Sequence, residues 1–284
     1  IMNMSTFVPT LLTNETYTNV TGGQVVNAVA LNGSVQFFSG LQANVTVVQP
    51  DLNFTGGVIH VIDSLLTLPQ NVTATAIAAN LTSLAGALTQ AELLQAVNDL
   101  SDVTIFAPNN AAFQSIGSAL PNLTAEDISS ILTYHVVNGT VGYSSTLMDS
   151  MTLPTLNGGN VTINIQNGSV FVNGAQVVVP DVLVANGVIH VIDNVLNPNN
   201  TSAAPEETAS SGSAAFPGAS SASEPPFTSG LPEASTTIGS GAPAATGAEG
   251  SGAAPSSSPA AAPMITGAVG AAALFGAGAV IMNI

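Results

Sequence analysis

Three histidines are the side chains of this sequence best suited to exchange protons near neutral pH. His60 and His190 each lie within an apolar run, and each is followed three residues later by an aspartate, Asp63 or Asp193. In a strand, residues three apart point to opposite faces, so this spacing does not place a histidine and its aspartate on one metal ion. We therefore expect buried histidines that bond to the backbone, and we expect no metal or other cofactor.

The other reactive groups do not form a catalytic pattern. His135 follows Tyr134 at the end of a predicted helix, where we expect it to contact the helix C-terminus or a neighbouring loop. The chain contains no Cys, no Lys and no G-x-S-x-G nucleophile turn. Carboxylate pairs such as Glu126 and Asp127 fall at predicted helix ends, where capping explains them. Because no acid, base and oxyanion site come together, we do not expect an enzyme.

The charge balance restricts the kinds of partner. Lys and Arg are absent, and sixteen acidic residues give a formal net charge of −16. Nucleic acid is excluded as a partner because binding it relies on cationic side chains that neutralise phosphates. Attraction to anionic lipid headgroups is disfavoured for the same reason.

Asparagine sequons are unusually frequent. The pattern Asn-x-Ser/Thr, with x not Pro, marks acceptors of N-linked sugar in secreted proteins and is expected on the surface. An alternative is that Asn, Ser and Thr are simply common in the loops of β-rich proteins. The sequon asparagines are Asn3, Asn14, Asn19, Asn32, Asn44, Asn53, Asn71, Asn80, Asn122, Asn138, Asn160, Asn167, Asn199 and Asn200.

An internal repeat divides the chain. The run Gly57-Val-Ile-His-Val-Ile-Asp63 recurs 130 residues later as Gly187-Val-Ile-His-Val-Ile-Asp193. Residues 5–68 repeat residues 150–198, so the first copy begins near the middle of its unit. We therefore expect residues 1–68 to be the C-terminal half of one domain and residues 69–198 to be a complete second domain. Residue 1 is then not expected to be the natural N-terminus.

The complete unit is predicted to place helices before strands. Residues 73–88 have helical spacing, and Thr89-Gln-Ala-Glu92 resembles a capping box that opens another helix through residue 100. Asn109 or Asn110 could cap a short helix, and Thr124 could start a further one. Expected strands cover 103–107, 161–165, 169–172, 176–179 and 188–192. This order predicts an α+β fold with N-terminal helices packed on a mostly antiparallel β-sandwich.

The last 86 residues differ in composition from the rest. Residues 199–263 are rich in Ser, Thr, Ala, Gly and Pro, which predicts a disordered stalk. Residues 264–284 are apolar and uncharged, which fits either a membrane-spanning helix or a glycosylphosphatidylinositol-anchor signal. The small residues Gly250, Ser251 and Gly252, followed by a spacer, favour the anchor signal, whose tail is removed from the mature protein.

Three motifs now point to a family. Thr104-Ile-Phe-Ala-Pro-Asn-Asn-Ala-Ala-Phe113 resembles the first signature of fasciclin domains, T-x-F-A-P-x-N-x-A-F. Tyr134-His135 resembles the Tyr-His motif of that family, and the run from Gly187 to Pro198 resembles its second signature. With the stalk and tail, the chain is similar to fungal fasciclin-like cell-surface glycoproteins that carry a lipid anchor. The matched positions are Thr104, Phe106, Ala107, Pro108, Asn110, Phe113, Tyr134, His135, His190 and Asp193.

The resemblance implies adhesion at the cell surface, the outer leaflet of the plasma membrane or the cell wall. Its partners would be cell-surface or matrix proteins, polysaccharides or a second copy, and its membrane contact would be the lipid anchor. In animal matrix members, an Asp-Ile pair and the Tyr-His region are implicated in integrin binding. The candidate positions here are Asp181-Val182, Asp51-Leu52 and Asp127-Ile128, for which loop or capping roles are the alternative. A binding module for a small apolar or polysaccharide ligand is the competing hypothesis.

Overall fold

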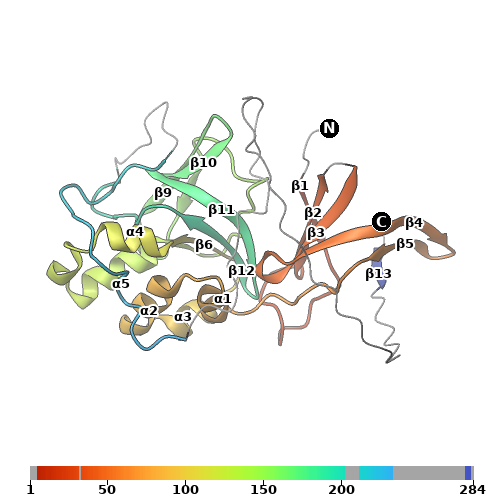
Figure 1. Ribbon diagram of the computed structural model, residues 1–284, viewed down its shortest axis with the longest axis horizontal. Coiled ribbons are helices and arrows are strands. Elements are labelled where there is room, and N and C mark those ends of the chain that lie inside the picture. Colours follow the sequence, from red (N-terminus) through yellow and green to blue (C-terminus); the bar gives the residue numbers. More distant parts are fainter. Residues whose placement is uncertain (1–4, 32, 202–210, 233–278, 283–284) are drawn as a thin grey trace, which may run out of the picture.

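Figure 1 shows the computed structural model, which describes residues 5–31, 33–201, 211–232 and 279–282. The first unit is a sheet in the order β1-β2-β3-β4-β5, and the second combines five helices with a seven-stranded sheet. The first-unit strands are β1 (Ser5–Pro9), β2 (Val25–Leu31), β3 (Ser34–Phe38), β4 (Asn44–Phe54) and β5 (Gly57–Ile62). The 3-10 helix η1 (Gly40–Gln42) joins β3 to β4.

The second unit begins with helices, as its sequence predicts. They are α1 (Val72–Ala78), α2 (Thr82–Gln90), α3 (Leu94–Asn98), α4 (Asn110–Ser115), the 3-10 helix η2 (Leu120–Asn122) and α5 (Ala125–Tyr134). The strands are β6 (Val103–Pro108), β7 (Val136–Val137), β8 (Thr152–Pro154), β9 (Asn160–Gln166), β10 (Ser169–Val172), β11 (Ala175–Val184) and β12 (Gly187–Ile192). The chain thus has an α+β fold in which helices cover a mostly antiparallel sheet.

The sheet of the second unit curls back on itself. Its strand order is β7-β6-β12-β11-β10-β9-β8, and only the β12–β6 pair is parallel. A bridge from Val137 to Thr155 links the β7 edge to the chain just beyond β8, at the opposite edge. One apolar cluster therefore fills the inside of the curve, with Phe106, Tyr134 and Ile163 fully buried. A second cluster lies between the sheet and the helices, so both faces of β12 are covered.

The helix break near residue 80 differs from the prediction. A single helix over 73–88 was expected, but the chain turns at Asn80, whose φ is +60°, and α2 continues to Gln90. The predicted capping box at Thr89 is wrong, because the Thr89 hydroxyl donates back to the Ala85 carbonyl within α2. The start of α2 is capped from a distance, since the Asn110 side chain accepts from the Ser83 N–H at 3.0 Å. This tertiary contact leaves no local signal in the sequence.

The helix expected from Thr124 is confirmed. The Thr124 hydroxyl accepts from the Asp127 N–H at 3.1 Å, and the Asp127 carboxylate accepts from the Thr124 N–H at 2.9 Å. These two bonds make a capping box, which satisfies donors that the first helical turn leaves free. The Thr124 hydroxyl also donates to the Asp127 carboxylate at 2.7 Å, and this bond, together with the one from the Thr124 N–H, lowers the pKa of the exposed Asp127 carboxyl.

The first-unit sheet packs against the end of the second unit. The Gln24 side chain donates to the Val184 carbonyl, and Asp102 accepts from the Thr21 N–H and hydroxyl. The Phe7 ring stacks on Tyr143 with ring centres 4.1 Å apart. At the edge of this sheet beyond β5, β13 (Ala279–Met282) pairs antiparallel with β5. In the second unit, β12 is the repeat of β5, and its corresponding edge pairs with β6.

Residues 211–232, which we call the strap, lie against the second unit (Figure 1). The segment was expected to belong to a disordered stalk over 199–263, and this expectation is wrong for the strap. Backbone groups of Ala222 and Gln114 bond at 2.9 Å, and the Ser118 N–H donates to the Ser220 carbonyl at 3.0 Å. Apolar side chains of the strap, including Phe216 and Phe227, pack on the helical cluster. A few large apolar residues therefore hold a segment whose average composition predicts disorder.

Gly86→Ala should release the strap. A Cβ at Gly86, inside α2, would stand 1.8 Å from the Phe227 carbonyl oxygen, whereas alanine itself favours the helix by up to about 1 kcal/mol. The expected result is severalfold faster chymotrypsin cleavage after Phe227, with the unfolding midpoint of the domain nearly unchanged. Trypsin is unsuitable because the chain has no Lys or Arg. Gln95→Ala, on the exposed surface of α3, is the control, and equal cleavage rates in the two variants would contradict the packing.

Candidate functional site

The first signature builds the junction between sheet and helices. Phe106 is fully buried on β6, and its ring stacks near His190 with centres 5.7 Å apart. The buried Thr104 hydroxyl accepts from the Gly142 N–H and donates to the Thr140 carbonyl. Ala107 is likewise fully buried, so these side chains hold β6 in place and offer no surface to a partner.

The residues that follow this strand connect it to two helices. Pro108 ends β6, and the Asn109 side chain then caps α4 by accepting from the Ala112 N–H at 2.7 Å. Asn110 donates to the Asn80 carbonyl at 3.0 Å while it caps α2. Phe113 of α4 is buried in the helical cluster. The paired asparagines of the signature therefore have separate structural roles.

The Tyr-His pair ends α5 inside the protein. The Tyr134 hydroxyl donates to the Asn160 carbonyl at 2.7 Å, and burial raises the pKa of this phenol. His135 Nε2 accepts from the Leu196 N–H at 2.9 Å, so Nδ1 carries the proton and donates to the Ile131 carbonyl at 2.7 Å. Burial lowers the pKa of His135 to about 4. The histidine is thus a neutral link between α5 and the end of the domain.

Both ring nitrogens of His190 are also hydrogen-bonded to backbone groups. Its Nδ1 accepts from the Asp181 N–H at 3.3 Å, which places the proton on Nε2, 2.7 Å from the Gly142 carbonyl. Asp181 adopts a left-handed φ of +59° where β11 bulges. In the first unit, Asp51 has a φ of +58° and its N–H donates to His60 Nδ1. The repeat therefore conserves a histidine-supported bulge within one chain.

Asp193 ties the end of the sheet to the strap. One carboxylate oxygen accepts from the Gln176 N–H at 2.8 Å, and the other accepts from the Gly212 N–H at 2.7 Å. Sequence reasoning assigned Asp193 to the motif but missed its bond to residue 212. The available signal was the presence of Phe216 and Phe227 in an otherwise small and polar stretch.

The three candidate adhesion aspartates have different surroundings. Asp181 is 6% exposed and accepts from the Ser144 N–H and hydroxyl, and the adjacent Val182 is 1% exposed. Asp127 is exposed but engaged in its capping box, while Ile128 lines an apolar hollow. Asp51 has a side chain that is 81% exposed and lies 3.9 Å from His60. Only Asp51 of the three presents a carboxylate that is both exposed and free of a capping bond.

Tyr143 was not singled out from the sequence, yet it lies between the two units. Burial, together with the negative charges of Asp181 and Asp102, raises the pKa of its phenol to about 12. The ring covers Phe7, so it belongs to the packing of the units.

The asparagines divide sharply by exposure. Eleven of the twelve described sequon asparagines are exposed and Asn200 is half-buried, whereas none of the ten other described asparagines is exposed. Seven of those ten use their side-chain N–H groups in hydrogen bonds, including Asn173 to Tyr134 and Asn186 to Val97. Only three of the twelve sequon asparagines do so. At most of the described sequons, the side-chain nitrogen that would carry a sugar therefore donates no hydrogen bond. Asn3 and Asn32 lie outside the described residues.

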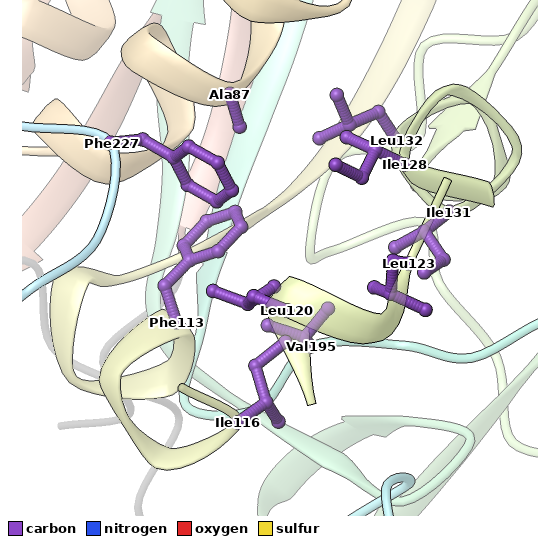
Figure 2. A pocket seen from close by; sticks show the side chains of 10 residues that line it. All are labelled: Ala87, Phe113, Ile116, Leu120, Leu123, Ile128, Ile131, Leu132, Val195 and Phe227. Carbon is purple, nitrogen blue, oxygen red and sulfur yellow. The ribbon is translucent and has the colours of Figure 1, made fainter. Parts of the chain in front are cut away.

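Ten apolar residues line a hollow in the helical layer (Figure 2). The Phe227 ring of the strap meets Phe113 edge-to-face there, with centres 6.1 Å apart. The remaining volume of about 10 Å³ suits roughly one water molecule. This hollow is too small for the apolar ligand of the competing hypothesis. The lining residues are Ala87, Phe113, Ile116, Leu120, Leu123, Ile128, Ile131, Leu132, Val195 and Phe227.

Other predicted features concern metals and membranes. Across the described ranges, no group of three or more His, Asp or Glu side chains is arranged to hold a metal ion. Within those same ranges, no helix combines the length and apolarity needed to cross a bilayer. The suggested anchor residues Gly250, Ser251 and Gly252 lie outside them, and of the apolar tail expected over 264–284 only Ala279–Met282, strand β13, is described.

Comparison with known proteins decides the family. The Fasciclin domain family matches residues 79–198, the unit whose motifs are described above. The chain belongs to the fasciclin-domain family. A fasciclin-like arabinogalactan protein of Arthroderma benhamiae is 45% identical over 232 residues, which are 82% of this chain and 55% of the relative. The fasciclin-like arabinogalactan protein CTB11 of Cercospora beticola is 35% identical over 67% of this chain and 52% of its own length.

The fasciclin chain thus spans little more than half the length of these two relatives. Among solved structures, a FAS1 domain pair from the insect cell adhesion molecule fasciclin I has a TM-score of 0.42 and 22% identity. That match covers 61% of this chain and 66% of the other.

Proposed function

We propose that this fasciclin protein acts outside the cell, as a glycosylated adhesion or wall-contact module presented on a lipid-anchored stalk. The observation that carries the proposal is the division of the asparagines, because exposure and a free side-chain nitrogen coincide with the sequon rather than with asparagine itself. This division favours selection for sugar acceptors over a general abundance of Asn in loops. The partners would be matrix or cell-surface proteins, polysaccharides or further copies.

The placement of the histidines and of the exposed side chains supports binding to another macromolecule rather than catalysis. His135 and His190 bond to separate backbone groups and do not converge on a carboxylate in a cleft. The exposed Asp51 stands on the long β4–β5 ribbon, which also exposes Leu52 and Phe54. A projecting ribbon with a free carboxylate beside apolar side chains is suited to contact another macromolecule (Figure 1). The anchor and the stalk beyond residue 232 are supported by composition alone.

Sugar attachment should follow exposure. In the full chain secreted from a glycosylating host, we expect glycans on most of the eleven exposed sequon asparagines and lower occupancy at Asn200. Glycopeptide mass spectrometry measures the occupancy of each site. Removing the sugars should lower solubility, because only 6% of residues are charged. Bare asparagines at most exposed sequons would contradict the proposal.

Bead clumping tests adhesion directly. Beads coated with the glycosylated chain should clump with each other or with cells of the source organism, and clumping should stop when the chain is unfolded. Asp51→Asn should reduce clumping severalfold, since asparagine tolerates the left-handed φ while it removes the charge. Asp149→Asn, at an exposed aspartate of the second unit where the change creates no new sequon, is the matched control. Absence of clumping with sugars intact would overturn the adhesion proposal.

A further inference from the structure

The strap has two parts joined by an exposed bend. Its first part is held near the end of the domain, where the Asn197 and Asn200 side chains donate to the Ala215 carbonyl at 3.2 and 3.0 Å. Pro217 and Gly218 are exposed, Gly218 has a φ of +82°, and a Cβ there would meet nothing within 4 Å. Residues 219–231, which we call the distal strap, then cross the helical layer.

The surface beneath the distal strap matches it in detail. Gln114 provides both a carbonyl for the Ala222 N–H and a side chain that donates to the Ala222 carbonyl at 3.0 Å. Ser118 bonds Ser220 in both directions, at 3.0 and 2.8 Å. Gly117 leaves the space that Ala222 fills, because a Cβ there would lie 2.3 Å from the Ala222 side chain.

The contact ends in an aromatic anchor. Phe227 sits over the apolar hollow beside Phe113 (Figure 2). Its carbonyl oxygen lies against Gly86 of α2. Yet the distal strap forms no helix or strand, and Phe227 and Leu231 are only partly buried. We use the name strap groove for Gly86, Phe113, Gln114, Gly117, Ser118 and the hollow. The groove thus recognises an extended segment through backbone bonds and one aromatic side chain.

We propose that the strap groove of one copy binds the distal strap of a second copy, by exchange at the Pro217–Gly218 bend. The strap groove and the distal strap belong to the same chain. Two copies can therefore exchange their distal straps, and each groove then makes with the other copy's strap the same contacts that it makes with its own. Such exchange of an identical element is a low-cost route to a dimer. Only the exposed bend must change conformation, and glycine adopts alternative φ values readily. This inference rests on the proposed adhesion and names a second copy as the partner.

High local concentration decides which state is populated. Within one chain, docking benefits from an effective concentration in the millimolar range for a short linker. Copies in solution therefore keep their own straps, whereas copies crowded on facing surfaces can exchange them. Homophilic contact is then expected to depend on surface density.

Disulfide trapping tests the exchange, because the chain has no cysteine of its own. One full-length chain carries Ser118→Cys, and a second, differently tagged chain carries Ser220→Cys; both positions are exposed. After the two are mixed on beads at clumping density and oxidised, we expect a covalent heterodimer. The control partner carries Ser229→Cys, an exposed serine of the same strap away from Ser118 contacts, and should give severalfold less heterodimer. A single chain with both Ser118→Cys and Ser220→Cys shows that the pair can close.

The outcomes separate this inference from adhesion itself. A heterodimer in severalfold excess over the Ser229→Cys control, lost in Phe227→Ala, supports strap exchange. If the double variant closes within one chain while the mixed chains give no excess, exchange is overturned. Beads that clump without this crosslink leave adhesion standing through another surface. A crosslink without clumping would support exchange and count against adhesion.

Discussion

Phe106→Ala should lower the free energy of unfolding of the second unit by about 3–5 kcal/mol, the usual cost of removing a buried phenylalanine ring. Phe106 is fully buried on β6, and its ring packs beside His190 on β12. The cavity would therefore open where the parallel strands β6 and β12 meet. Urea unfolding followed by far-UV circular dichroism measures the loss, since the chain has no Trp for fluorescence.

Phe54→Ala provides the matched control. Phe54 is 43% exposed on the β4–β5 ribbon, so its removal should cost less than about 1 kcal/mol. Similar losses in the two variants would show that Phe106 does not organise the core. A large loss at Phe106 alone would show that the first signature acts through the fold, and that contact residues have to be sought elsewhere.

Acidification from pH 6.5 to pH 4 should cost the folded domain about 3 kcal/mol through His135. Burial lowers the folded pKa to about 4, against an ordinary value of 6.5. Between these two values the unfolded chain binds a proton that the folded domain does not, so the free energy of unfolding rises with pH. The stabilisation is complete above pH 6.5 and is lost as the pH falls to about 4. Protonation would also remove the acceptor of the Leu196 N–H.

His135→Gln isolates this effect. Glutamine does not titrate, so the variant should be less stable at pH 7, and between pH 6.5 and 4 its free energy of unfolding should fall by about 3 kcal/mol less than that of the parent. Urea unfolding at a series of pH values gives the slope. Gln95→Ala, at an exposed residue of α3 that does not titrate, is the control and should keep the slope of the parent. If the free energy of unfolding of His135→Gln depended on pH as steeply as that of the parent, His135 would be ruled out as the source of the pH dependence.

Family membership could be predicted from sequence because its signals are short and local. The order T-x-F-A-P, Tyr-His and the second signature identifies the domain, and the helix at Thr124 follows from a capping box within four residues. Strands β10 and β12 follow from apolar runs bounded by Asn-Gly and Gly. Local patterning of this kind needs no knowledge of distant contacts.

Long-range contacts decided what the sequence left open. Asn110 caps α2 across 27 residues, so the helix boundary near Asn80 has no local signature. Asp181 is buried and accepts from the Ser144 N–H, whereas its repeat mate Asp51 is exposed, although both follow Pro in the sequence.

The sequence by itself determined the repeat, the family and the sequon pattern, because each is written in neighbouring residues. Only the tertiary structure decided that the sequon asparagines are the exposed ones and that the strap lies on the helices. Composition averages over a segment, but folding depends on whether a few side chains find a complementary surface. Phe227 finds one beside Phe113, and two phenylalanines with a few backbone bonds hold residues that are otherwise small and polar.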